Sequence, residues 1–181
     1  MRRSPVTVLI LVALASLVSV PAVRPAKAQG CTENGCGEPP RQLAGPRFGA
    51  TAVTGRLAGE LRDHGIRPVM SQLGWQTEQS LMVTADSARI VSEQVWLIGG
   101  TEQRTFLPSL SWVLGYRWRG GREVGVGINY SLAPGVVLAA GKSFALGPML
   151  IPVNLAIVAG GGGARVSLLT GLVGPDLRHR R

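Results

Sequence analysis

Apolar and polar residues alternate with a period of two along most of this chain beyond residue 69. From Glu123 to Leu132 the even positions are apolar or aromatic, and small or polar residues occupy the odd positions. The stretches 72–83, 106–118 and 149–157 show the same alternation. Successive side chains of a β-strand point to opposite sides, so this period predicts strands with two unlike faces.

Short glycine-rich connections separate the alternating stretches. Arg119–Arg122 is predicted to be a two-residue Gly-Gly hairpin, and the segments 133–135, 147–148 and 160–163 are similar turns. Eight strands result, at about 47–54, 69–84, 88–101, 105–119, 122–132, 135–145, 148–159 and 164–173. An up-and-down meander of eight strands closes naturally into a barrel, which leaves no exposed edge.

One short segment changes period. Leu57, Leu61 and Ile66 are spaced as on a helix within residues 56–66, and Gly65 is expected to stop it. The chain is therefore predicted to be all-β, with one helical insertion after its first strand.

Residues 1–28 have the features of a secretory signal peptide. Arg2 and Arg3 precede an apolar run from Val6 to Val20, and Ala26–Ala28 has the small-x-small pattern of a cleavage site. The run is shorter than the roughly 20 residues that cross a bilayer as a helix, which favours cleavage over an uncleaved anchor. Cleavage would lower the net charge from +9 to +5, because residues 1–28 hold four basic residues and no acidic one. A nucleic-acid partner is therefore not expected.

Residues 29–46 are polar and rich in proline, and they are predicted to form a flexible lead-in. They contain both cysteines of the chain, Cys31 and Cys36. An exported chain meets an oxidising environment, so a disulfide between these two is the favoured interpretation. Lipid attachment at Cys31 is an alternative with a poorly matching recognition box, and a metal site would need more ligands than two cysteines.

The composition of the strands indicates whether each face meets water, lipid or the barrel interior. Residues 124–164 contain one charged residue, Lys142, whereas a soluble barrel needs a well-solvated outer surface. In a membrane barrel the apolar face meets lipid, and the polar face of small residues packs into a narrow lumen. Aromatic residues that could partly supply interfacial girdles are Trp75, Trp96, Trp112, Tyr116, Trp118 and Tyr130.

The chain resembles the small eight-stranded bacterial outer-membrane β-barrel proteins in its leader, in its meander from Arg47 to Val173, and in strands such as Val124–Tyr130. This resemblance of pattern implies a barrel over residues 47–174, a basic tail at 175–181, and membrane lipid as a partner. Pro108 and Pro152 fall inside predicted strands. We expect them at bulges or rims, because proline cannot donate a ladder hydrogen bond.

Six polar residues are candidates for a network inside the barrel: Gln76, Glu78, Arg117, Glu123, Asn129 and Arg165. Because side chains normally fill an eight-stranded lumen, a structural network is preferred to a transport filter.

Catalytic candidates are few. Asp63 and His64 are more typical of a solvated helix face, and His179 lies in the basic tail. The glycine run at 160–163 lacks the Lys-Ser/Thr pair and the following helix that a phosphate loop needs. Neither an enzymatic activity, a cofactor nor a metal is expected.

Two hypotheses of function follow. The first is an exported outer-membrane barrel with a structural or interaction role. The second is a soluble periplasmic or extracellular barrel whose apolar inner face binds a lipid or another hydrophobic ligand.

Overall fold

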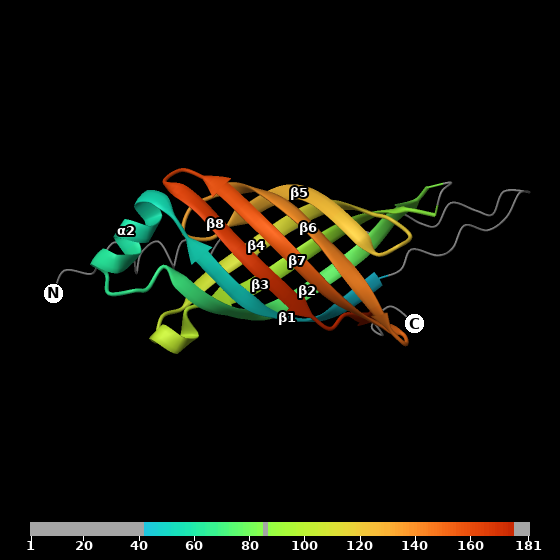
Figure 1. Ribbon diagram of the computed structural model, residues 1–181, viewed down its shortest axis with the longest axis horizontal. Helices are drawn as coiled ribbons and strands as arrows, with labels where there is room; N and C mark the ends of the chain where they lie inside the picture. The colour runs from blue at the N-terminus through green and yellow to red at the C-terminus, as the bar shows by residue number, and fades with distance from the viewer. Residues whose placement is uncertain (1–41, 85–86, 176–181) are drawn as a thin grey trace, which may run out of the picture. The chain divides into compact units, whose positions relative to one another are not determined.

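Eight long antiparallel strands dominate the computed structural model, which describes residues 42–84 and 87–175 (Figure 1). The strands are β1 (Gln42–Val53), β2 (Val69–Val83), β3 (Arg89–Gly99), β4 (Leu107–Arg117), β5 (Arg122–Tyr130), β6 (Gly135–Leu146), β7 (Met149–Gly160) and β8 (Gly163–Gly171). Helix α2 (Gly55–Asp63) follows β1, and a short 3-10 helix, η2 (Thr101–Gln103), precedes β4. No helix in the described ranges is long and apolar enough to cross a bilayer.

The sheet closes on itself. Each strand from β2 to β8 pairs with the next, and β1 pairs with both β2 and β8. Phe48 of β1 lies opposite Leu73 of β2 on one side and opposite Thr170 of β8 on the other. A two-residue strand, β9 (Gly174–Pro175), pairs with the beginning of β1 outside the ring. The predicted eight-stranded up-and-down barrel is confirmed.

The barrel has two distinct ends. The helix end carries the connections 54–68, 100–106, 131–134 and 161–162. The terminal end carries the connections 84–88, 118–121 and 147–148, each shorter than the two longest connections of the helix end, together with Gln42 and Pro175. The longest connection, which contains α2, is therefore opposite the first and last described residues (Figure 1).

Helix α2 ends as the sequence predicted. Gly65 has a left-handed φ of 74°, which glycine adopts without steric cost. Its N–H donates to the carbonyl of Arg62 at 2.8 Å, and the N–H of Ile66 donates to the carbonyl of Leu61 at 2.8 Å. These two bonds form a Schellman motif, which satisfies the last carbonyls of the helix.

An apolar cluster joins α2 to the barrel. The buried side chains of Leu57, Ala58 and Leu61 pack with Val53 of β1 and Met70 of β2. Partly buried residues from the start of β4 and from the β5–β6 connection pack against the same cluster. The cluster therefore extends across the helix end from β1 to the β5–β6 connection.

Two elements differ from the prediction. β1 begins at Gln42 and not at Arg47, so the last residues assigned to the lead-in pair with β2. These residues lack a clear alternation because Ala44 and Gly45 carry almost no polarity signal. The 3-10 helix η2 was not predicted, since a three-residue element has too few positions to show a period.

The β4–β5 hairpin also differs. Trp118 N–H donates to the carbonyl of Arg122 at 2.9 Å, and Gly121 N–H donates to the carbonyl of Trp118 at 2.9 Å. The loop is thus three residues, Arg119 to Gly121, and the predicted two-residue Gly-Gly turn is wrong. Gly121 has φ 77°, the left-handed position of a three-residue hairpin loop with a bulge.

Both strand prolines lie where a ladder is incomplete. Pro108 pairs with Ile98 of β3 but lies beyond Leu110, where pairing with β5 ends. Pro152 pairs with Ser143 of β6, whereas regular pairing of β7 with β8 begins one residue later. The rim positions expected for them are confirmed.

Candidate functional site

Exposed apolar residues lie on the outward face of all eight strands, and polar residues interrupt this face at Thr77, Gln79, Ser92 and Gln94 of β2 and β3. Leu73 and Tyr130, for example, expose 62% and 63% of their surface. We call the following residues the apolar belt: Phe48, Leu73, Trp75, Trp96, Ile98, Trp112, Leu114, Val124, Val126, Ile128, Tyr130, Val136, Leu138, Phe144, Val153, Leu155, Ile157 and Leu168. Contiguous exposed apolar surfaces of this kind mark contact with a membrane or with another protein.

The inward face carries the polar residues. Buried polar side chains include Arg47, Thr51, Gln76, Glu78, Ser80, Glu93, Arg117, Glu123, Asn129, Arg165 and Ser167. Three of them are arginines and three are glutamates, so their formal charges cancel. Burial of unpaired charges is expensive, and the interior as a whole carries no net formal charge.

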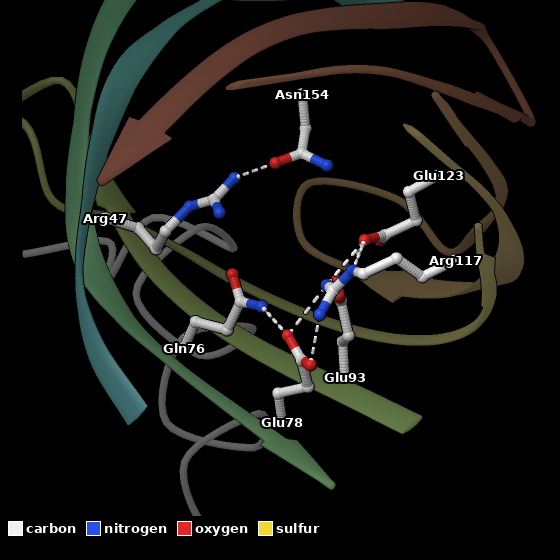
Figure 2. Close-up of polar contacts among 7 residues, drawn as sticks. All are labelled: Arg47, Gln76, Glu78, Glu93, Arg117, Glu123 and Asn154. Carbon is white, nitrogen blue, oxygen red and sulfur yellow. Dashed lines mark hydrogen bonds and ion pairs between the residues drawn. The ribbon is translucent and has the colours of Figure 1, made fainter. Parts of the chain in front are cut away.

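Arg117 lies at the centre of the main charged group (Figure 2). Its Nη2 donates to Glu78 at 2.8 Å and to Glu93 at 3.0 Å, and its Nε donates to Glu123 at 2.6 Å. Glu123 is the direct partner of Arg117 across β4 and β5. One guanidinium therefore connects carboxylates from β2, β3 and β5 to β4.

Arg47 and Gln76 extend this polar region toward β1 and β7. Arg47 Nη2 donates to Asn154 Oδ1 at 2.8 Å, and Gln76 Nε2 lies 3.4 Å from Glu78 Oε2. Figure 2 shows Arg47 and Gln76 entering the lumen from the left of the view, and Arg117 and Glu123 entering it from the right. Arg47 Nε and Gln76 Oε1 are the buried side-chain atoms of the described residues that have no hydrogen-bond partner.

A second polar group surrounds Asn129. Arg165 Nη2 donates to Asn129 Oδ1 at 3.0 Å, and Asn129 Nδ2 donates to the hydroxyls of Ser109 at 2.8 Å and Ser111 at 2.9 Å. The arginine is held by a neutral amide, in contrast to Arg117.

Apolar residues fill other parts of the interior. Val95, Leu97 and Leu169 form one buried cluster. A second consists of Val113, Val137 and Val158, with two alanines packed against it. The inward face thus combines salt-bridged and apolar groups and is occupied by side chains.

All six residues proposed for the lumen are buried on the inward face. The structure brings Gln76, Glu78, Arg117 and Glu123 together, while Asn129 and Arg165 form the second group. The pair Cys31 and Cys36 lies outside the described residues.

Sequence reasoning missed three members of the main group: Arg47, Glu93 and Asn154. Glu93 stands where both faces of β3 are apolar nearby, because Val95 and Leu97 point inward while Trp96 and Ile98 point outward. Its pairing partner Glu78 could have indicated it, because two glutamates that face each other on neighbouring strands can bind the same cation.

A carboxylate at the helix end holds η2 against β2. The hydroxyl of Ser71 donates to Glu102 Oε2 at 2.5 Å, and the backbone N–H of Ser71 donates to Oε1 at 3.1 Å. Gln103 Nε2 donates to the same carboxylate at 3.1 Å. These hydrogen bonds, that of the Ser71 hydroxyl first, lower the pKa of Glu102 to about 2.

The catalytic candidates have simple local surroundings. His64 caps the C-terminus of α2, with Nδ1 2.7 Å from the carbonyl oxygen of Glu60, and Asp63 is exposed. His179 lies outside the described residues. Within residues 42–84 and 87–175, no three histidine, cysteine or acidic side chains are arranged to hold a metal ion.

No family model, curated protein or solved structure matches this chain.

Proposed function

We propose that this chain is an exported, non-enzymatic β-barrel of the outer-membrane type with a structural or interaction role. The observation that carries the proposal is the polarity of its faces: the apolar belt points outward, and six ionisable side chains are buried inside. Full removal of a large aliphatic or aromatic side chain from water is worth about 1.5–3 kcal/mol. Lipid around the belt would supply that stabilisation.

The strands have suitable lengths. Each of the eight barrel strands has between 9 and 15 residues, and a tilted strand needs about 9–11 to cross the hydrocarbon layer. Closure between β1 and β8 gives their backbone groups partners inside the sheet, as a water-free environment requires.

The positions of the aromatic residues and the connections support the same proposal. Phe106 and Tyr130 lie exposed at the helix end, while Trp118 and Phe144 lie exposed toward the terminal end, as two interfacial girdles would. Outer-membrane barrels have short periplasmic turns and longer external loops. We therefore orient the terminal end toward the periplasm and α2 toward the outside.

The alternative, a soluble carrier of a hydrophobic ligand, has less support. A carrier binds its ligand on inward-facing apolar side chains. Here the inward face holds Arg117 with three glutamates, and the apolar residues that a carrier would enclose are on the outside.

Fractionation of the expressed full chain tests the proposal. We expect the protein to stay in the membrane pellet after salt and carbonate washes, to need detergent for extraction, and to change gel mobility on heating. Release of folded protein by carbonate alone would contradict the proposal, and binding of an apolar fluorophore by that soluble protein would support the carrier instead.

A pair of variants sharpens this test. Leu138→Arg places a cation in the belt and should destabilise a membrane barrel by about 2–4 kcal/mol if the site lies near the bilayer centre. Thr101→Arg adds the same charge at an exposed position of η2 and should have little effect. Equal stability of the two variants in lipid would argue that the belt faces water.

A further inference from the structure

Two cations interrupt the otherwise uncharged outward face of the described strands. Arg122 of β5 and Lys142 of β6 are both exposed, and the other strand residues with charged side chains follow the inward alternation. Arg122 and Lys142 are direct partners in the β5–β6 ladder. The two cationic residues therefore occupy neighbouring positions on the outward surface of the barrel.

This arrangement is unfavourable by itself. Like charges directly opposite each other on neighbouring strands repel and destabilise the pair. Neither side chain forms an ion pair with any residue of the described chain. The ammonium of Lys142 lies 5.1 Å from the centre of the Phe144 ring, a contact that orients the cation but does not neutralise it.

Aromatic rings and an apolar surface border the two cations. Tyr116 of β4 and Trp118, which directly follows β4, stack edge to face with ring centroids 4.9 Å apart. Toward the helix end, the next outward partners on β5 and β6 are Val124 with Ala140 and then Val126 with Leu138. A cationic site bordered by amphipathic aromatic rings and followed by an apolar surface fits a molecule that has an anionic head and a hydrocarbon tail.

We propose that Arg122 and Lys142 together bind the phosphate group of a membrane phospholipid whose acyl chains lie on the belt beside Val124 and Leu138. The inference rests on the proposed membrane location and adds a specific lipid site to it. The phosphate brings the missing negative charge between the two cations, and charge-assisted hydrogen bonds from both hold it. We assign a lipid and not free phosphate to this site, because free phosphate would contact only the cations and leave the adjacent apolar surface without a role.

Native mass spectrometry of the detergent-folded barrel tests the site. The wild type, Arg122→Gln/Lys142→Gln and the control Arg56→Gln/Arg62→Gln are incubated with phosphatidylglycerol, phosphatidylcholine or inorganic phosphate. The control removes the same charge from exposed positions on α2. A cation near a membrane surface adds roughly a factor of five in affinity for anionic lipid. We expect the first variant to bind phosphatidylglycerol about 30-fold more weakly and the control to bind it like the wild type.

A second measurement separates binding from folding. Phosphatidylglycerol should raise the unfolding temperature of the wild type and of the control, and leave that of Arg122→Gln/Lys142→Gln unchanged. Equal retention of phosphatidylglycerol by all three proteins, or an equal response of the wild type to inorganic phosphate, would overturn the lipid site. If the three proteins nevertheless insert into vesicles, the proposed membrane location is retained and only the lipid site is rejected. A barrel that stays in water and ignores vesicles overturns both.

Discussion

Glu78 and Glu93 lie directly opposite each other on β2 and β3, and both carboxylates accept hydrogen bonds from the same nitrogen, Nη2 of Arg117. Two like charges in this position would push the strands apart. The guanidinium lies between the two carboxylates and attracts both, and it also binds Glu123 of β5. A single residue of β4 thus ties together the interior of half the barrel.

Removal of the Arg117 cation should destabilise the barrel strongly. In Arg117→Gln three buried carboxylates lose the cation that contacts them directly, and breaking a buried ion pair in this way typically costs about 3–5 kcal/mol. Urea unfolding in detergent micelles, followed by the heat-dependent gel shift, measures the loss. Arg119→Gln, which removes an exposed cation from the nearby turn, is the matched control and should change stability little.

A charge-balanced variant checks the cause. Glu93→Gln/Arg117→Gln removes one carboxylate together with the cation and should be more stable than Arg117→Gln alone. If the double variant is the less stable of the two, carboxylate repulsion is not what Arg117 offsets.

Glycine has opposite roles at two positions. A Cβ added to Gly74 of β2 would lie 1.8 Å from the carbonyl oxygen of Trp96, so the β2–β3 pair would have to separate. Gly59 in α2 has open space around it. We expect Gly74→Ala to cost at least about 1–3 kcal/mol through overpacking, and Gly59→Ala to stabilise by up to about 1 kcal/mol through helix propensity. Thermal unfolding of both variants shows whether the signs differ; a neutral Gly74→Ala would mean that the strands can move apart freely.

Acid should release η2 from β2. The pKa of Glu102 is lowered to about 2, so the ionised carboxylate stabilises the folded connection above the ordinary value of 4.5, and this stabilisation is lost as the pH falls toward 2. Hydrogen exchange of the Ser71 amide, measured from pH 5 to pH 2, should show increasing exposure after correction for intrinsic rates. In Ser71→Ala the carboxyl should titrate closer to 4.5, and an unchanged titration in that variant would rule out the Ser71 hydroxyl as the cause.

The four tryptophans report directly on the surroundings of the outward face. Trp75, Trp96, Trp112 and Trp118 all expose between 39% and 56% of their surface. In vesicles with brominated acyl chains we expect strong quenching of their fluorescence and little quenching by aqueous acrylamide. The reverse pattern would mean that these rings face water.

The alternation of the strands made much of this fold predictable. In β5 each outward residue from Val124 to Tyr130 is apolar and each inward one is Gly or Asn, so the strand and its two unlike faces were evident from the sequence. Gly65 marked the end of α2 for an equally local reason, the left-handed φ that it adopts.

The interior was less predictable because its contacts join distant strands. Arg47 and Asn154 are 107 positions apart and meet only once β1 and β7 are placed around the same lumen. Six lumen residues could be chosen from their polarity on an inward position, whereas the division into an Arg117 group and an Asn129 group depends on the tilt and stagger of the strands. The three-residue β4–β5 loop likewise required the hydrogen bonds of Trp118.

Because β1 pairs with β8, the barrel can close only after the last strand has been synthesised. Thr51 and Ser167, whose hydroxyls lie 2.6 Å apart across this seam, are 116 positions apart, so the first strand made must wait for the last. Such distant contacts form slowly, because closing a long loop lowers the conformational entropy of the chain before the strand pairing stabilises it. Until the barrel closes, the chain exposes an unpaired strand edge and apolar side chains, which associate with other chains. We therefore expect this protein to depend on a holding chaperone between its synthesis and its closure, and to aggregate when made faster than such a chaperone can bind it.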